Sequence, residues 1–138
     1  MQITKLRAED IDIISVYRSS DCAVRDMVDI LKDIIKENQT TIIVGDFNLC
    51  MIDEKTNGVI RFLEGAGFSQ HTLDATHLLG GHIDHVYSNH NPALYSIDVI
   101  LYSSYYTCLD HDAILVTLKK VNDIKVYIHE NIDKQLML

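Results

Sequence analysis

The sequence predicts an α/β or α+β domain in which one mixed sheet of about five strands carries two main helices on one face. Two segments have the apolar periodicity of helices, and several short apolar segments have the composition of strands. A length of 138 residues suits one domain. With 47% hydrophobic and 23% charged residues and a single proline, the composition is that of a globular protein and not of a disordered chain.

The first half of the chain contains the clearest elements. Ile11 to Tyr17 is mostly β-branched or aromatic and is predicted to be a strand. Ser19, Ser20 and Asp21 are N-cap candidates for a helix, and the segment after them carries an apolar stripe at helical spacing, with Asn38 as the expected C-terminal stop. The stripe consists of Val24, Met27, Val28, Leu31, Ile34 and Ile35.

A buried strand is predicted from Thr40 to Val44 and is ended by Gly45. Thr56 or Asn57 can cap a second helix, which Gly67 would end in a left-handed turn. After residue 68 the pattern changes to short strands separated by polar turns. These strands are expected at Ile83–Ser88, Tyr95–Leu101, Ala113–Leu118 and Asp123–His129.

The net charge of −8 argues against a module that binds nucleic acid through a basic surface, because an acidic surface repels phosphate backbones. It does not exclude an enzyme that meets phosphate through a bound cation. Carboxylates gathered around a divalent ion add negative charge to the chain, and the ion then inverts the local electrostatics.

The three cysteines, Cys22, Cys50 and Cys108, are widely spaced and include no CxxC pair, so we expect reduced thiols. The first ten residues lack the apolar core of a signal peptide. No apolar run approaches the length of about 20 residues that spans a bilayer. We therefore expect an intracellular protein, nuclear or cytoplasmic and not secreted, with no membrane partner.

The first polar residues that could take part in binding or catalysis are in the segment Gly45-Asp46-Phe47-Asn48, at the end of the predicted strand. Alternation of side chains lets Asp46 and Asn48 face one way while Phe47 anchors the loop in the core. A carboxylate can hold a cation or a water molecule, and an amide can donate to a phosphate oxygen. The alternative is that both polar residues merely cap a turn.

Two later segments have a similar character. In His82-Ile83-Asp84-His85, the carboxylate of Asp84 interrupts an apolar strand and should have a partner such as an imidazole. Asp110 and His111 stand side by side before another strand, where a carboxylate suits a hard cation and a histidine can contact phosphate or move a proton. The alternatives are a solvated strand residue for Asp84 and a polar turn for Asp110-His111.

In order, spacing and context, the three segments together resemble the C-terminal half of the endonuclease/exonuclease/phosphatase (DNase-I-like) superfamily. The likeness is nearest to the endonuclease domains of mobile elements such as retrotransposons. The strand that ends at Tyr17 extends the match upstream, so the resemblance covers roughly residues 10–118. It implies half of a four-layer α/β sandwich, with residues 1–120 as a partial domain and 121–138 as a C-terminal extension.

The resemblance also implies an activity, the metal-dependent hydrolysis of phosphodiesters, with DNA as substrate and Mg²⁺ or Mn²⁺ as cofactor. Asp46 would position or deprotonate the attacking water or help to hold the metal, and Asp110 would be a metal ligand. Asp84 would orient His111, which would contact the phosphate in the transition state. Asn48 and Tyr17 would bind phosphate oxygens.

A half-domain also implies an open sheet face, because the family packs two sheets against each other. We therefore expect a large exposed apolar face or its cover by a homodimer or a partner chain. Two other functions stay open: a catalytically inactive relic or partner-binding half-domain, and a sugar- or lipid-phosphate phosphatase of the same superfamily.

Overall fold

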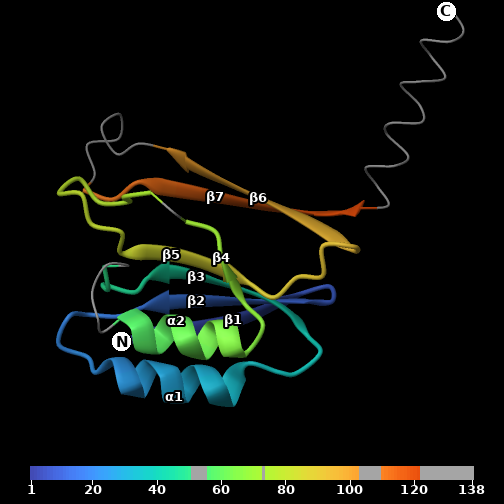
Figure 1. Ribbon diagram of the computed structural model, residues 1–138, viewed down its shortest axis with the longest axis horizontal. Coiled ribbons are helices and arrows are strands. Elements are labelled where there is room, and N and C mark those ends of the chain that lie inside the picture. The colour runs from blue at the N-terminus through green and yellow to red at the C-terminus, as the bar shows by residue number, and fades with distance from the viewer. Residues whose placement is uncertain (51–55, 73, 103–109, 122–138) are drawn as a thin grey trace, which may run out of the picture.

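The computed structural model describes residues 1–50, 56–72, 74–102 and 110–121, and within them the chain forms three layers. Two helices cover one face of a five-stranded sheet, and a two-stranded sheet lies on its other side (Figure 1). The described elements are β1 (Gln2–Ala8), β2 (Ile11–Tyr17), α1 (Val24–Ile34), β3 (Thr40–Asp46), α2 (Thr56–Gly65), β4 (Ser69–Gln70), β5 (Asp84–Ser88), β6 (Tyr95–Tyr102) and β7 (Ala113–Lys120).

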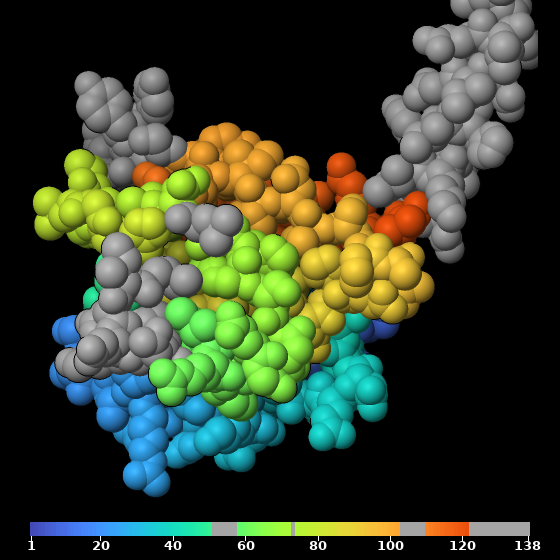
Figure 2. All heavy atoms as spheres, viewed as in Figure 1, coloured from blue at the N-terminus to red at the C-terminus, as the bar shows by residue number. Residues whose placement is uncertain are grey.

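The large sheet has the strand order β1-β2-β3-β5-β4. Strands β2 and β3 are parallel, with α1 as their crossover, and the other neighbours are antiparallel. A mixed five-stranded sheet with two helices is the fold class that the sequence predicts, and this prediction is confirmed. Figure 2 shows the same layers in spheres, with α1 in blue, α2 in green and β6 in orange from one side to the other.

The core lies between the large sheet and the helices. Alternate residues of β2, β3 and β5 point toward the helices, as the pleat of a strand requires. The buried set includes Ile14, Val16, Ile43, Tyr87, Met27, Leu31, Val59 and Leu63. Burial of each large apolar side chain contributes about 1.5–3 kcal/mol, so this layer supplies much of the stability of the fold.

The predicted ends of the first helix need correction. Its N-cap is Ala23, with no side-chain hydrogen bond, and not one of the candidates Ser19, Ser20 and Asp21. Helix α1 begins at Val24 and ends at Ile34 with the extended residue Ile35 as its C-cap, so Asn38, which has a φ of +57°, lies in the following loop and does not end the helix. Gly67 also takes a positive φ, +84°, after α2.

Strand β1 is absent from the sequence prediction. Its residues, QITKLRA, are mostly polar and mostly exposed, so they carry no apolar pattern. What makes them a strand is their antiparallel pairing with β2 across the tight turn at Glu9, which has a φ of +54°. An edge strand of this kind is specified by its neighbour and not by its own burial.

The prediction of a single sheet also needs correction, because β6 and β7 pair only with each other among the described strands. The alternation predicted for β6 is present: Tyr95 is buried, Val99 and Leu101 are half-buried, and Ile100 is exposed. Alternation shows that one face of a strand is buried, but it does not say which sheet the strand joins.

The second sheet changes the expectation of an open apolar face. Val86 and Ile42 lie on the face of the large sheet away from the helices, yet both are buried. Exposed apolar side chains occur instead on the outer side of the small sheet, at Ile100, Tyr102 and Leu115. The expected cover of the open sheet face by a second copy or a partner chain remains a prediction.

The strand expected at Asp123–His129 and nearly all of the extension at residues 121–138 lie outside the described residues. Within the described parts of the chain, no helix is long and apolar enough to cross a membrane. Cys22 is half-buried and forms no disulfide within the described residues.

Candidate functional site

Three of the predicted site residues lie in one row across the large sheet. Tyr17 at the end of β2 pairs with Asp46 at the end of β3, and Asp46 pairs with Asp84 at the start of β5. Residues paired in register share a face of the sheet. The row lies on the face away from the helices, so residues that are 67 positions apart in the sequence (17 to 84) become neighbours.

The loop after β3 turns sharply at this edge. Phe47 is fully buried in the core, which confirms that it anchors the loop. Asn48 has a φ of +48°, and its backbone N–H donates to Asp46 Oδ1 at 2.8 Å. Asparagine tolerates this left-handed conformation better than most residues. No hydrogen bond to the Asn48 side-chain amide occurs within the part of the chain that the structure describes, so its role in binding phosphate stays a prediction.

Asp84 and His111 form a direct pair. His111 Nδ1 lies 2.9 Å from Asp84 Oδ2, and the backbone N–H of Asp84 donates to the Thr76 hydroxyl at 3.1 Å. His111 is placed by an isolated antiparallel bridge with His77, which precedes the turn into β5. A carboxylate on Nδ1 fixes the ring orientation and leaves Nε2 to face other groups.

The electrostatics of the site differ from those of isolated side chains. Burial raises the pKa of Asp46, with a further increase from the charge of Asp84, while the Asn48 N–H and His111 act in the opposite direction. The hydrogen bond to Asp84 raises the pKa of His111, and the charges of Asp84, Asp46 and Asp110 add to the effect. Asp46 is thus a stronger base than an ordinary aspartate, and His111 a more persistent cation than an ordinary histidine.

Among the described residues, two overlapping groups of side chains could hold a metal ion. One contains Asp46, Asp84 and His111, and the other contains His77, Asp110 and His111; in each, one ligand atom per residue lies within 4.8 Å of the others. Carboxylate oxygens are the donors that Mg²⁺ and Mn²⁺ prefer, and Mg²⁺ keeps several of its own waters, so a site with one or two carboxylates fits it. Asp46 and Asp110, the two predicted ligands, fall in different groups that meet at His111.

Sequence reasoning missed Arg18 as a support of this site. Its side chain is buried, and its guanidinium donates to the carbonyls of Phe47 at 2.7 Å and Asn48 at 2.9 Å, and to that of Cys22. The backbone N–H of Arg18 also donates to the Asp46 carbonyl at 2.9 Å. An arginine directly after a strand that ends in Tyr was visible in the sequence, but the carbonyls of Phe47 and Asn48 lie 29 and 30 residues away.

His85 holds the same loop from the other side. Its ring is fully buried and stacks on Phe47, with ring centroids 4.8 Å apart. Its Nε2 lies 2.9 Å from the Leu49 carbonyl and 3.0 Å from the His82 carbonyl, and burial lowers its pKa. A neutral ring that donates from Nε2 satisfies these contacts, so His85 is a structural residue that holds the loop.

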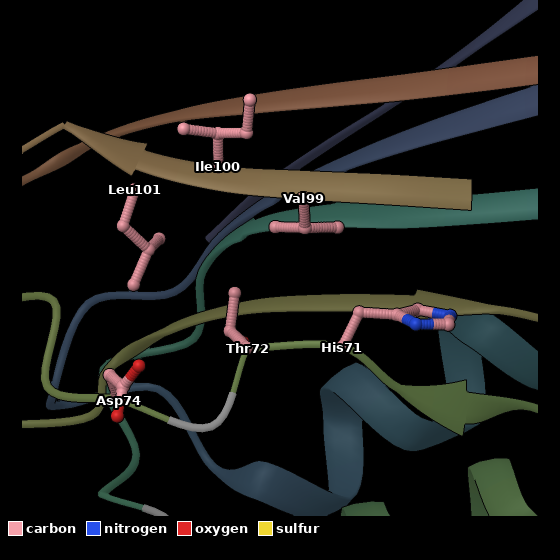
Figure 3. Close-up of a pocket in the computed structure, with 6 residues that line it drawn as sticks. All are labelled: His71, Thr72, Asp74, Val99, Ile100 and Leu101. Atoms are coloured by element: carbon pink, nitrogen blue, oxygen red, sulfur yellow. The ribbon is translucent and has the colours of Figure 1, made fainter.

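A cavity of about 430 Å³ opens beside the site, between β6 and the segment that follows β4. Val99 and Leu101 point into it from β6, Thr72 and Asp74 lie below them, and Ile100 points away (Figure 3). None of the predicted site residues lines this cavity. The Thr72 hydroxyl links the cavity to the site, because it donates to the Asp84 carbonyl at 3.2 Å.

Replacing Asp84 with asparagine is expected to lower the pKa of His111, because the change removes both the charge and the anionic acceptor of its ring N–H. In the unchanged protein the stabilisation from this pair is fully present below the ordinary histidine pKa of about 6.5, and it is lost as the pH rises through the higher pKa of the folded state. The other groups that face His111 are Asp46, Asp110 and His77.

An NMR titration of the His111 ring in metal-free protein measures this shift directly. Asp98→Asn is the control, because Asp98 is an exposed residue of β6. A His111 pKa that is the same in Asp84→Asn and in the unchanged protein would contradict the assigned pair.

Comparison with solved structures finds this arrangement of strands and helices in a chain of the crystal structure of cytolethal distending toxin (CDT) from Actinobacillus actinomycetemcomitans. The TM-score is 0.58 and the sequence identity 13%, over 83% of this chain and 52% of that chain. That neighbour has a DNase-I-like fold. This chain shares the DNase-I-like fold.

The two chains share this fold at a sequence identity of 13%, which is too low to transfer the activity of the neighbour to this chain. The chain spans about half the length of its structural neighbour. The sequence matches no model of a known protein family and no curated protein. A nearest relation to mobile-element endonucleases rests on the short motifs alone.

Proposed function

We propose that this chain carries part of a phosphodiesterase site of DNase-I-like type, which acts on DNA with Mg²⁺ or Mn²⁺. The observation that carries the proposal is the convergence of Asp46, Asp84 and His111, three residues of three separate motifs, within 4.8 Å on one face of the sheet. A turn-capping role for each motif separately would not require them to meet.

Each residue has a task that its surroundings support. Asp46, whose pKa is raised by burial, orients an attacking water and accepts its proton. Asp84 holds His111 in one orientation, and the charged imidazole of His111 binds a phosphate oxygen as negative charge grows in the transition state. Tyr17 and Asn48, at the ends of β2 and β3, contribute a hydroxyl and an amide for the remaining phosphate oxygens.

Asp46 and Asp110 are the residues that we assign to metal binding. Mg²⁺ or Mn²⁺ would supply Lewis-acid charge at the phosphate when bound. A bound cation would also reduce the electrostatic repulsion of DNA. The protein has a net charge of −8 and repels a DNA backbone unless the carboxylates at the site are neutralised. Motifs that resemble mobile-element endonucleases favour DNA over RNA or small phosphate esters as substrate.

A second candidate is a catalytically inactive half-domain that binds a partner. The observation that favours it is the coverage of 52% of the structural neighbour. In this case the site geometry would persist without turnover.

Nicking of a supercoiled plasmid by the purified chain separates the two candidates. We expect nicking in Mg²⁺ or Mn²⁺ and none in a chelator, and a loss of roughly 100-fold or more in Asp46→Asn, as for removal of a general base. Asp98→Asn removes the same kind of charge from the exposed side of β6 and should nick normally. Nicking that persists in Asp46→Asn would refute the assigned site, whereas a folded, inactive unchanged protein would favour the half-domain.

A further inference from the structure

His77 is held in a fixed position next to the proposed site. It forms the backbone bridge with His111, and the neighbouring Leu78 N–H donates to the Asp110 carbonyl at 2.9 Å. On the other side, the N–H of His77 and the carbonyl of Gly81 are joined at 3.0 Å across a tight turn. Two sets of backbone bonds therefore fix the place of His77 relative to His111.

Contacts of the His77 ring determine which nitrogen carries the proton. The backbone N–H of Leu79 donates to Nδ1 at 3.1 Å, so the lone pair of Nδ1 is used. In a neutral ring one nitrogen accepts and the other donates, which places the proton on Nε2. Asp110 Oδ2 lies 4.0 Å from Nε2, too far for a hydrogen bond. Among the described residues, Nε2–H therefore has no hydrogen-bond acceptor.

The two imidazoles stand close together at right angles. Their ring centroids are 4.9 Å apart at 88°, and a ring nitrogen of each lies within 4.8 Å of the other. His111 gives Nδ1 to Asp84, so its Nε2 is the nitrogen left for another group. The site therefore has two neighbouring imidazole nitrogens in addition to the carboxylates already described.

A metal ion and an oxyanion make opposite demands on His77. A metal requires a lone pair on Nε2, and this pair is available only if the proton moves to Nδ1, which breaks the hydrogen bond from the Leu79 N–H. An oxyanion requires N–H, which is what the observed tautomer offers.

We propose that His77 is a further substrate-contacting residue, which donates Nε2–H to a phosphate oxygen next to the one bound by His111. The identity of the ligand as a phosphodiester rests on the proposed function. His77 would raise affinity for the phosphate without taking part in proton transfer, because its Nδ1 is occupied by the backbone of its own loop.

The test uses ¹⁵N-histidine protein without metal and inorganic phosphate as the probe, with the ring nitrogens followed by NMR. We expect Nε2 of His77 to carry a proton before phosphate is added, and both His77 Nε2 and His111 to shift as phosphate binds. His77→Ala should weaken phosphate binding roughly tenfold, as for loss of a charge-assisted hydrogen bond, and His77→Gln should restore part of it with a side-chain N–H. His90→Ala, a histidine change on the loop after β5, should have no effect.

Each outcome decides between the proposals. A shift of His111 alone would overturn the role of His77 and leave the proposed function standing. If phosphate shifts the signals of neither ring, both the role of His77 and the proposed function would be contradicted. Loss of the Nε2 proton on addition of Zn²⁺ alone would show a metal ligand and overturn the inference. Shifts of both rings in a protein that does not nick plasmid would keep the His77 contact and remove the hydrolytic activity.

Discussion

Gly45→Ala is expected to destabilise the protein by about 4 kcal/mol or more, the upper range for single substitutions. A Cβ added to Gly45 would lie 1.9 Å from the carbonyl oxygen of Val16 on the neighbouring strand, a distance at which backbone atoms must move. The residue also has a φ of +145°, which side chains rarely allow. The parallel pair β2–β3 would separate at the point where it presents Tyr17 and Asp46.

Urea unfolding followed by circular dichroism measures this loss. Gly58→Ala is a matched control, because nothing lies within 4 Å of the position of its added Cβ and the residue is in α2. Alanine there should stabilise the protein by up to about 1 kcal/mol through helix propensity. A Gly45→Ala protein as stable as the unchanged one would show that the strands approach each other less closely than described.

Arg18→Met is expected to cost about 3 kcal/mol and to loosen the loop after β3. Methionine keeps the apolar stem but removes the donors to the carbonyls of Phe47, Asn48 and Cys22. Buried carbonyls without donors cost about 1–3 kcal/mol each, although entering water will recover part of this. Because this loop carries Asp46 and Asn48, any nicking activity should fall further than the change in stability accounts for.

Arg25→Ala provides the comparison for Arg18→Met. Arg25 is an exposed residue of α1 whose ion pair with Asp29 has an N···O distance of 3.7 Å, and such pairs contribute about 0.5 kcal/mol or less. Equal unfolding midpoints for Arg18→Met and Arg25→Ala would mean that the guanidinium does not hold the loop.

Elements with a strong internal pattern could be predicted from the sequence. Helix α1 has an uninterrupted apolar stripe, β2 has one buried face, and β3 is buried or half-buried along its whole length. Strand β1 could not be predicted, since its residues are exposed and only the pairing with β2 makes them a strand. The sequence also could not predict that β6 and β7 form a separate sheet. It shows that a strand is amphipathic but not which strand it pairs with.

The candidate site divides in a similar way. The residue types and their order predicted Asp46, Asp84 and His111 as members of one site, and the structure brings these three together. Asp110 lies beside His77 in an adjoining group, and Tyr17, which is half exposed, lies in register with Asp46. The roles of Arg18 and His85 in holding the loop were not predicted. Their partners are backbone carbonyls, which every residue has, so the sequence does not show which carbonyl a side chain will bind.

The sequence by itself determined which residues are apolar at which period, and which carboxylates and imidazoles follow strands. Strand pairing decided the rest: the register Tyr17–Asp46–Asp84, the 2.9 Å contact between Asp84 and His111, and the layer that covers Val86. The physical reason is that periodicity is a local property of burial, whereas register depends on contacts between segments far apart in the chain. A site assembled from three strand ends therefore exists only in the folded protein, although each of its residues is visible beforehand.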